Sequence, residues 1–132
     1  MRCVARNESS DGVTVFSAID RDRVLAAVSD WAAIVQARAR DVRRIGLFGS
    51  YARGDYAPGS DVDLLIVVAH SDQPVWYLRA ARFDTSALPV GADVFVYTQA
   101  EVERMQRDNP WLRHVLTEAI WLPLPPARGD GP

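Results

Sequence analysis

One apolar run near the middle of the chain limits most strongly what this sequence can fold into. Residues Val62 to Ala69 are almost all apolar and follow the turn formers Gly59 and Ser60. A run of this length, bounded by turn residues, is typical of a strand that is covered on both faces. The sequence therefore predicts a central strand here, and helices or other strands that bury it.

The segments on either side of this strand carry the patterns of further strands and helices. Arg43–Phe48 is a short β-like run, and Ala92–Tyr97 alternates like a third strand. Apolar residues recur at helical spacing from Asp20 to Arg38, which predicts an amphipathic helix. The other expected helices are a short one early in 51–60, one opened by proline over Pro74–Phe83, one from the capping box at Thr98 to about Arg107, and one from Asn109 to Ile120.

The length of 132 residues suits one ordinary domain. We expect a loose N-terminal segment over 1–16, a single domain over 17–122, and a disordered Pro- and Gly-rich tail over 123–132. Trp111 and Trp121, which flank the apolar face of the last expected helix, are assigned to the core. No apolar run is long enough to span a bilayer, and Cys3 is the single cysteine, so we expect a cytoplasmic protein and no membrane partner.

The charge composition excludes several kinds of function. The formal net charge is −2 and the pI is about 5.6, so no general positive field attracts nucleic acid, and no direct nucleic-acid binding is expected. All 15 basic residues are arginine. Functions that need a lysine, such as the phosphate-binding P-loop and Schiff-base catalysis, are therefore excluded.

Two aspartates open the central strand. With 13 aspartates in the chain, an Asp-x-Asp pair is expected by chance, and Asp20 and Asp22 form another. Asp61 and Asp63 differ because they stand where a buried strand begins, and side chains two residues apart on a strand share a face about 7 Å apart. Two like charges held together favour a compensating cation, and magnesium prefers such carboxylates. This pair points to metal-assisted phosphoryl or nucleotidyl transfer.

Two further features support a phosphate-binding site. Gly49 and Ser50 lie between a strand and a helix, where a glycine permits close approach of a ligand and unpaired N–H groups face phosphate. Asp93 starts the third expected strand, so its carboxylate reaches the same site if that strand lies beside Val62–Ala69.

These residues resemble a known family. Gly49-Ser50, ten intervening residues, Asp61-x-Asp63 and the later strand acid Asp93 are similar to the motif of the polymerase-beta-like nucleotidyltransferases, and most similar to the minimal nucleotidyltransferase branch. The resemblance covers residues 20 to 122. It implies an α/β (α+β) fold with a mixed β-sheet flanked by helices. It also implies that Gly49 and Ser50 bind the triphosphate of ATP, that Asp61 and Asp63 bind Mg²⁺, that Asp93 is a metal ligand or activates the attacking hydroxyl, and that Arg53 touches phosphate.

The resemblance also implies a partner. Minimal nucleotidyltransferases of this length resemble antitoxins that transfer AMP to a tyrosine of a HEPN-type ribonuclease toxin, with which they form a hetero-oligomer. The leading hypothesis is therefore a protein adenylyltransferase that acts as an antitoxin. Two alternatives stay open: an antitoxin that inhibits by contact alone with a vestigial nucleotide site, and a nucleotidyltransferase that acts on a small molecule.

Overall fold

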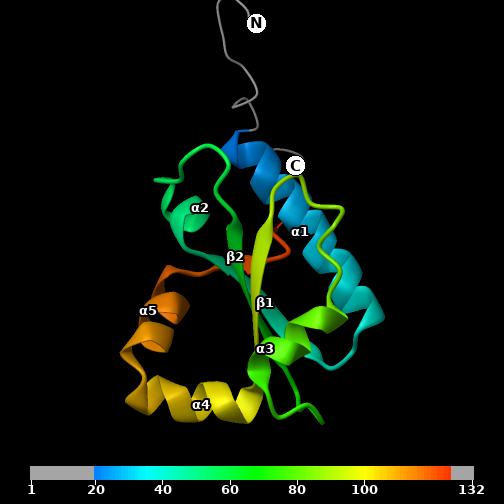
Figure 1. Ribbon diagram of the computed structural model, residues 1–132, viewed down its shortest axis with the longest axis vertical. Helices are drawn as coiled ribbons and strands as arrows, with labels where there is room; N and C mark the ends of the chain where they lie inside the picture. The colour runs from blue at the N-terminus through cyan, green and yellow to red at the C-terminus, as the bar shows by residue number, and fades with distance from the viewer. Residues whose placement is uncertain (1–19, 126–132) are drawn as a thin grey trace, which may run out of the picture.

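The computed structural model describes residues 20–125 and contains one mixed, four-stranded sheet in the order β3-β2-β1-β4 (Figure 1). Strand β1 runs antiparallel to both β2 and β4, and β2 runs parallel to β3. The strands are β1 (Val42–Phe48), β2 (Val62–Val68), β3 (Ala92–Thr98) and β4 (Ile120–Leu122). The mixed sheet flanked by helices is confirmed, and so is the central strand: every residue of β2 is buried except the half-buried Asp63. The loose segment expected over 1–16 lies outside the described residues.

Helix α1 (Arg21–Arg38) covers one face of this sheet (Figure 1). It begins where predicted, because the Asp20 carboxylate accepts the N–H of Arg23 at 2.9 Å and so caps the first turn. Val24 and Val28 of its apolar stripe are fully buried in the cluster that contains Ile45 and Leu64.

Helices α4 (Gln99–Asp108) and α5 (Pro110–Glu118) cover part of the opposite face. The predicted capping box at the start of α4 is present, with Thr98 and Glu101 satisfying each other's backbone N–H groups. Val102 of α4 and Leu112 of α5 are fully buried against Leu65 of β2. None of the helices in residues 20–125 is long and apolar enough to cross a membrane.

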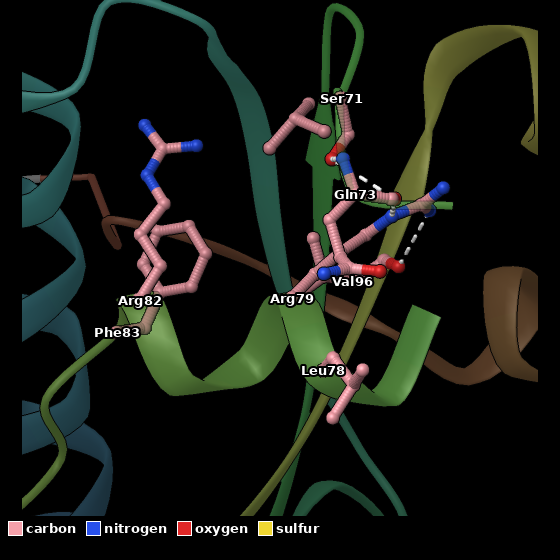
Figure 2. A pocket seen from close by; sticks show the side chains of 8 residues that line it. Ser71, Gln73, Leu78, Arg79, Arg82, Phe83 and Val96 are labelled. Atoms are coloured by element: carbon pink, nitrogen blue, oxygen red, sulfur yellow. Dashed lines mark hydrogen bonds between the residues drawn. The ribbon is translucent and has the colours of Figure 1, made fainter. Parts of the chain in front are cut away.

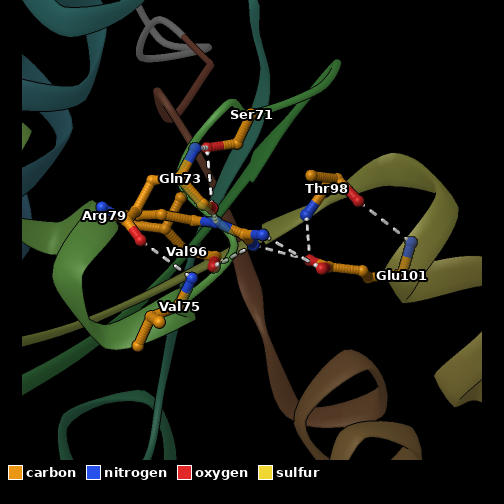
Figure 3. A network of polar contacts seen from close by, with 7 residues as sticks. All are labelled: Ser71, Gln73, Val75, Arg79, Val96, Thr98 and Glu101. Carbon is orange, nitrogen blue, oxygen red and sulfur yellow. Dashed lines mark hydrogen bonds and ion pairs between the residues drawn. The ribbon is translucent and has the colours of Figure 1, made fainter.

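The helix expected over Pro74–Phe83 is wrong in its start and in its type. Helix α3 covers only Trp76–Arg79 and passes into a 3-10 turn, η2, at Ala80–Arg82. The segment is held by one buried side chain rather than by an apolar face. The Arg79 guanidinium donates to the Val96 carbonyl at 3.2 Å and to both carboxylate oxygens of Glu101 at 2.6 and 3.1 Å (Figure 3). Since these partners lie on β3 and α4, the short helix is fixed by its arginine.

A small pocket of about 180 Å³ opens beside this network. Figure 2 shows Arg79 and Phe83 at its wall, together with Gln73 from the loop before α3. The pocket is lined by Val68, the last residue of β2, whereas Asp63 lies near the first. It is therefore at the opposite end of the strand from the predicted acids.

The last expected helix is too long by two residues. Helix α5 ends at Glu118, and Ile120 belongs to β4, which pairs with β1. The core assignment of Trp111 is also wrong, because 40% of its surface is exposed, while Trp121 lies half-buried in β4 against Gly46. In the described part of the tail, the Leu124 N–H donates to the Ser29 hydroxyl at 2.7 Å. Residues 126–132 of the expected tail lie outside the described residues.

Candidate active site

The candidate site begins at Gly49, between strand β1 and the four-residue helix α2 (Ser50–Arg53). Gly49 has φ 82° and ψ −156°, a backbone conformation that is essentially restricted to glycine. A Cβ placed there would also collide with the carboxylate of Asp63. The turn thus requires glycine for two reasons. It places the Asp63 carboxylate against the backbone at the end of β1.

The three predicted acids lie around the start of the parallel pair β2 and β3. Asp63 is paired with Phe48 of β1 on one side and with Asp93 of β3 on the other. The condition that the third strand should lie beside the central one is therefore met. Asp61 precedes β2, and its carboxylate packs against Gly91, where a Cβ would also collide.

The electrostatics of Asp63 reflect this crowding. Burial raises the pKa of the Asp63 carboxyl, and the neighbouring charges of Asp93 and Asp61 raise the pKa further, while Arg53 acts in the opposite direction. Asp61 and Asp93 are exposed and Asp63 is half-buried. A cation at this place would relieve the repulsion among the three acids, as expected for a metal site.

A fourth carboxylate, which the sequence reasoning missed, belongs to the same site. Glu118, the last residue of α5, accepts the N–H of Gly49 at 2.6 Å through Oε2 and a guanidinium N–H of Arg53 at 3.0 Å through Oε1. Its side chain is only 10% exposed. Burial alone would raise the pKa of Glu118, but the hydrogen bond from Gly49 and the Arg53 guanidinium outweigh it and lower the pKa below its ordinary value. One local signal existed: a negative charge at the C-terminal end of a helix opposes the helix dipole.

The remaining predicted residues lie on α2. Ser50 is its first residue and is half-buried, next to the Gly49 turn. The Arg53 side chain is 47% exposed and joins Glu118 to Asp55, whose carboxylate accepts Arg53 Nε at 3.1 Å. The Arg53 guanidinium is therefore bound to carboxylates of the same chain, and its predicted contact with phosphate stays a prediction.

The donor chemistry suits magnesium only in combination with a ligand. Within residues 20–125, no three His, Cys, Asp or Glu side chains are grouped closely enough to hold a metal ion by themselves. Magnesium usually keeps several waters and takes one or two carboxylates together with substrate phosphates. Asp61, Asp63 and Asp93 can supply such carboxylates beside the Gly49 turn.

Comparison with known proteins decides the family. The model of the family described as "Nucleotidyltransferase domain" matches residues 29–120, which include every residue of the candidate site. This chain belongs to that family. The nucleotidyltransferase match extends from the middle of α1 to the start of β4, so it includes the whole sheet except the end of its last strand.

One relative and one solved structure are also similar to this chain. A Methanocaldococcus jannaschii protein named as a candidate protein adenylyltransferase is 65% identical over 26 residues, which are 20% of this chain and 26% of that protein. The chain thus matches about a quarter of that relative's length. The crystal structure of a candidate nucleotidyltransferase from Sulfolobus solfataricus aligns with a TM-score of 0.53 at 24% identity. The alignment covers 72% of this chain and 85% of the archaeal one, and shows that the two share a fold.

Proposed function

We propose that this nucleotidyltransferase is a magnesium-dependent protein adenylyltransferase that transfers AMP from ATP to a tyrosine of a HEPN-type ribonuclease toxin, and so acts as an antitoxin. The observation that carries the nucleotidyl-transfer step is the pairing of Asp63 with Asp93 directly beside the Gly49 turn. The short match to a relative named for protein adenylylation supports a protein acceptor, and the resemblance to minimal nucleotidyltransferase antitoxins supports the toxin.

The reaction assigns a distinct task to each group. The acceptor hydroxyl oxygen attacks the α-phosphorus of ATP, a new oxygen–phosphorus bond forms, and the bond to the leaving pyrophosphate breaks. Asp93, which is exposed at the start of β3, accepts the hydroxyl proton. Asp61 and Asp63 would hold magnesium, which neutralises charge developing on the pyrophosphate. The Gly49 N–H, the Ser50 hydroxyl and Arg53 bind the phosphates.

The test uses the protein with a toxin-like partner encoded beside it. Both proteins are incubated with magnesium and ATP, and intact mass spectrometry of the partner detects an added AMP. Peptide mapping then identifies the modified side chain. We expect one AMP per tyrosine modified, and we expect the double variant Asp61→Asn, Asp63→Asn to lose transfer by several orders of magnitude, because the ligands of the ion are gone.

Two outcomes would replace the proposal. If the wild type left no AMP on the partner while the double variant still neutralised it, inhibition by contact alone would be the function. If AMP appeared only on a small molecule, nucleotidyl transfer would stand and the antitoxin role would fail. Asp72→Asn serves as the matched control, since it makes the same chemical change at an exposed position after the far end of β2.

Binding of the nucleotide tests the role of the acids separately. Calorimetry is expected to show clear ATP binding with magnesium and much weaker binding in a chelator, because the carboxylates repel an unshielded triphosphate. Equal affinity under both conditions would remove the acids from the nucleotide site.

A further inference from the structure

The donors that should bind phosphate already hold a carboxylate of the same chain. We infer that Glu118 is an internal competitor of the nucleotide, which must displace the Glu118 carboxylate from the Gly49 N–H and the Arg53 guanidinium before its phosphates can bind there. This inference rests on the proposed nucleotide site and concerns how that site is regulated.

The geometry of the contact leaves little room for sharing. A backbone N–H carries a single hydrogen, and the hydrogen of Gly49 is used by Glu118 Oε2 at 2.6 Å, a short charge-assisted bond. The second oxygen, Oε1, holds Arg53 Nη1 at 3.0 Å. Glu118 thus bridges a backbone N–H and a guanidinium with its two oxygens, which is how a phosphate oxygen pair is usually bound.

The negative charge of Glu118 also repels the triphosphate of the nucleotide. The site holds four carboxylates, those of Asp61, Asp63, Asp93 and Glu118. A triphosphate that enters beside these groups meets four carboxylates while Glu118 is in place. When Glu118 leaves, one negative charge is removed and both the Gly49 N–H and the Arg53 Nη1 contact are freed. A phosphate oxygen and Glu118 therefore exclude each other at the Gly49 N–H, which has one hydrogen to donate.

The Glu118 carboxylate also contacts a side chain of its own helix. His114 lies one turn earlier on α5, and its Nε2 is 3.3 Å from Glu118 Oε1. The imidazole is 67% exposed, so a rotation of the Glu118 side chain toward it leads to solvent. The Ala119 N–H donates to the Val115 carbonyl at 2.9 Å and holds the backbone at this helix end, so the proposed displacement is a rotation of the Glu118 side chain.

Binding measurements on two variants test the inference. Glu118→Ala removes both the charge and the acceptor oxygens, whereas Glu118→Gln removes the charge and keeps one acceptor oxygen. The probes are ATP and inorganic tripolyphosphate, each with magnesium, titrated by calorimetry. If the Glu118 carboxylate occupies the phosphate site in about nine protein molecules out of ten, its removal raises the affinity for the nucleotide about tenfold. We expect a gain of about three- to tenfold for Glu118→Ala and a smaller gain for Glu118→Gln.

Weaker binding in both variants would overturn the inference and make Glu118 a residue that positions Gly49 and Arg53. Unchanged binding would overturn it as well. Glu103→Gln is the matched control: Glu103 is exposed on α4, where it accepts a hydrogen bond from Gln99 at 3.0 Å, and the same chemical change there should leave affinity unaltered.

A measurement on the wild type covers the case in which a variant fails to fold. The ¹³C carboxyl resonance of Glu118 is followed while magnesium tripolyphosphate is added, and it should move as the carboxylate loses its two donors. A resonance that stays fixed at saturation would overturn the inference. Transfer assays separate the two proposals. If AMP is transferred but Glu118→Ala does not bind the nucleotide more tightly, only the inference that Glu118 competes with the nucleotide fails. If Glu118→Ala binds more tightly but no AMP is transferred, only the proposed adenylyltransferase function fails.

Discussion

The substitution Asp63→Asn should stabilise the fold while abolishing nucleotidyl transfer. Asp63 is half-buried, faces Asp93 on the neighbouring strand, and has a carboxyl pKa that burial and the charges of Asp93 and Asp61 raise. Asparagine has nearly the same shape and lacks the charge. A residue that lowers stability at neutral pH and yet lies at the centre of a site is more readily explained by function than by folding.

The expected gain can be estimated from the strand geometry. Favourable cross-strand side-chain pairs contribute about 0.2–1 kcal/mol, and like charges directly opposite each other are destabilising; we take a cost of the same size for Asp63 and Asp93. Asp61 adds a second repulsive partner, so a gain of about 0.5–1.5 kcal/mol is expected at neutral pH. For a domain of this size the melting temperature should rise by about 2–6 °C. Arg53 opposes the effect of the acids on Asp63, which favours the lower part of this range.

The pH dependence gives an independent sign. Because folding raises the pKa of Asp63, the fold loses stability as the pH rises from the ordinary aspartate pKa to the raised pKa, and the loss is complete above the raised pKa. The advantage of asparagine is therefore complete at neutral pH. This advantage should shrink as the pH falls through the raised pKa. It should vanish below the ordinary pKa of an aspartate, where the side chain at position 63 is uncharged in both wild type and Asp63→Asn.

Thermal unfolding checks both the size of the gain and its pH dependence. It is measured for wild type, Asp63→Asn and the control Asp72→Asn, in a chelator, from neutral to acidic pH. The control should show no comparable gain. Magnesium should then raise the melting temperature of the wild type more than that of Asp63→Asn, because a ligand stabilises only the form that binds it. A melting temperature of Asp63→Asn below that of wild type at neutral pH would refute the reasoning from charge repulsion.

Three further substitutions have defined outcomes. Ser50→Ala should weaken magnesium-ATP binding about three- to tenfold with at most about 1 kcal/mol of stability lost; a large melting loss with unchanged binding would make the hydroxyl merely structural. Gly49→Ala should cost about 1–3 kcal/mol of backbone strain and should also displace the Asp63 carboxylate. Gly59, with φ 83° and open space around it, is the control: Gly59→Ala should show the strain alone in thermal unfolding and keep ATP binding. Arg79→Met should cost about 2–4 kcal/mol in urea unfolding, because Glu101, one-quarter exposed, loses its buried partner; a cost below about 1 kcal/mol would contradict this account of the network.

The sheet could be predicted largely because its strands carry strong local patterns. The apolar run of β2 is typical of a strand in a sheet that is covered on both faces. The position of Asp61 and Asp63 follows from where this run begins. The placement of Asp93 needed one fact beyond local pattern, the parallel pairing of β3 with β2 in register. The functional roles of Asp61, Asp63 and Asp93 remain predictions.

The errors fall where tertiary contacts override local preference. Pro74 suits the first turn of a helix, yet the segment is held by the guanidinium of Arg79 in contact with Val96 and Glu101, residues distant in sequence. At the other end, Ile120 continues the apolar pattern of α5 but forms β4, because the edge of β1 offers backbone partners that a longer helix would leave unpaired.

Glu118 could not be placed from sequence, since its role depends on that same edge. Leu47 pairs with Ile120, and continuing this antiparallel register two residues along β1 and two residues back along the chain brings Gly49 opposite Glu118. A glutamate at the end of a helix is locally unfavourable, because its charge faces the negative pole of the helix dipole. The N–H of Gly49 and the guanidinium of Arg53 offset that cost. The pairing of β4 therefore determines which carboxylate reaches the phosphate donors, so a variant that disrupts β4 should release Glu118 as well and tighten tripolyphosphate binding. Trp121→Ser in the middle of β4 is such a variant, and calorimetry that shows weaker binding despite an intact fold would contradict this link.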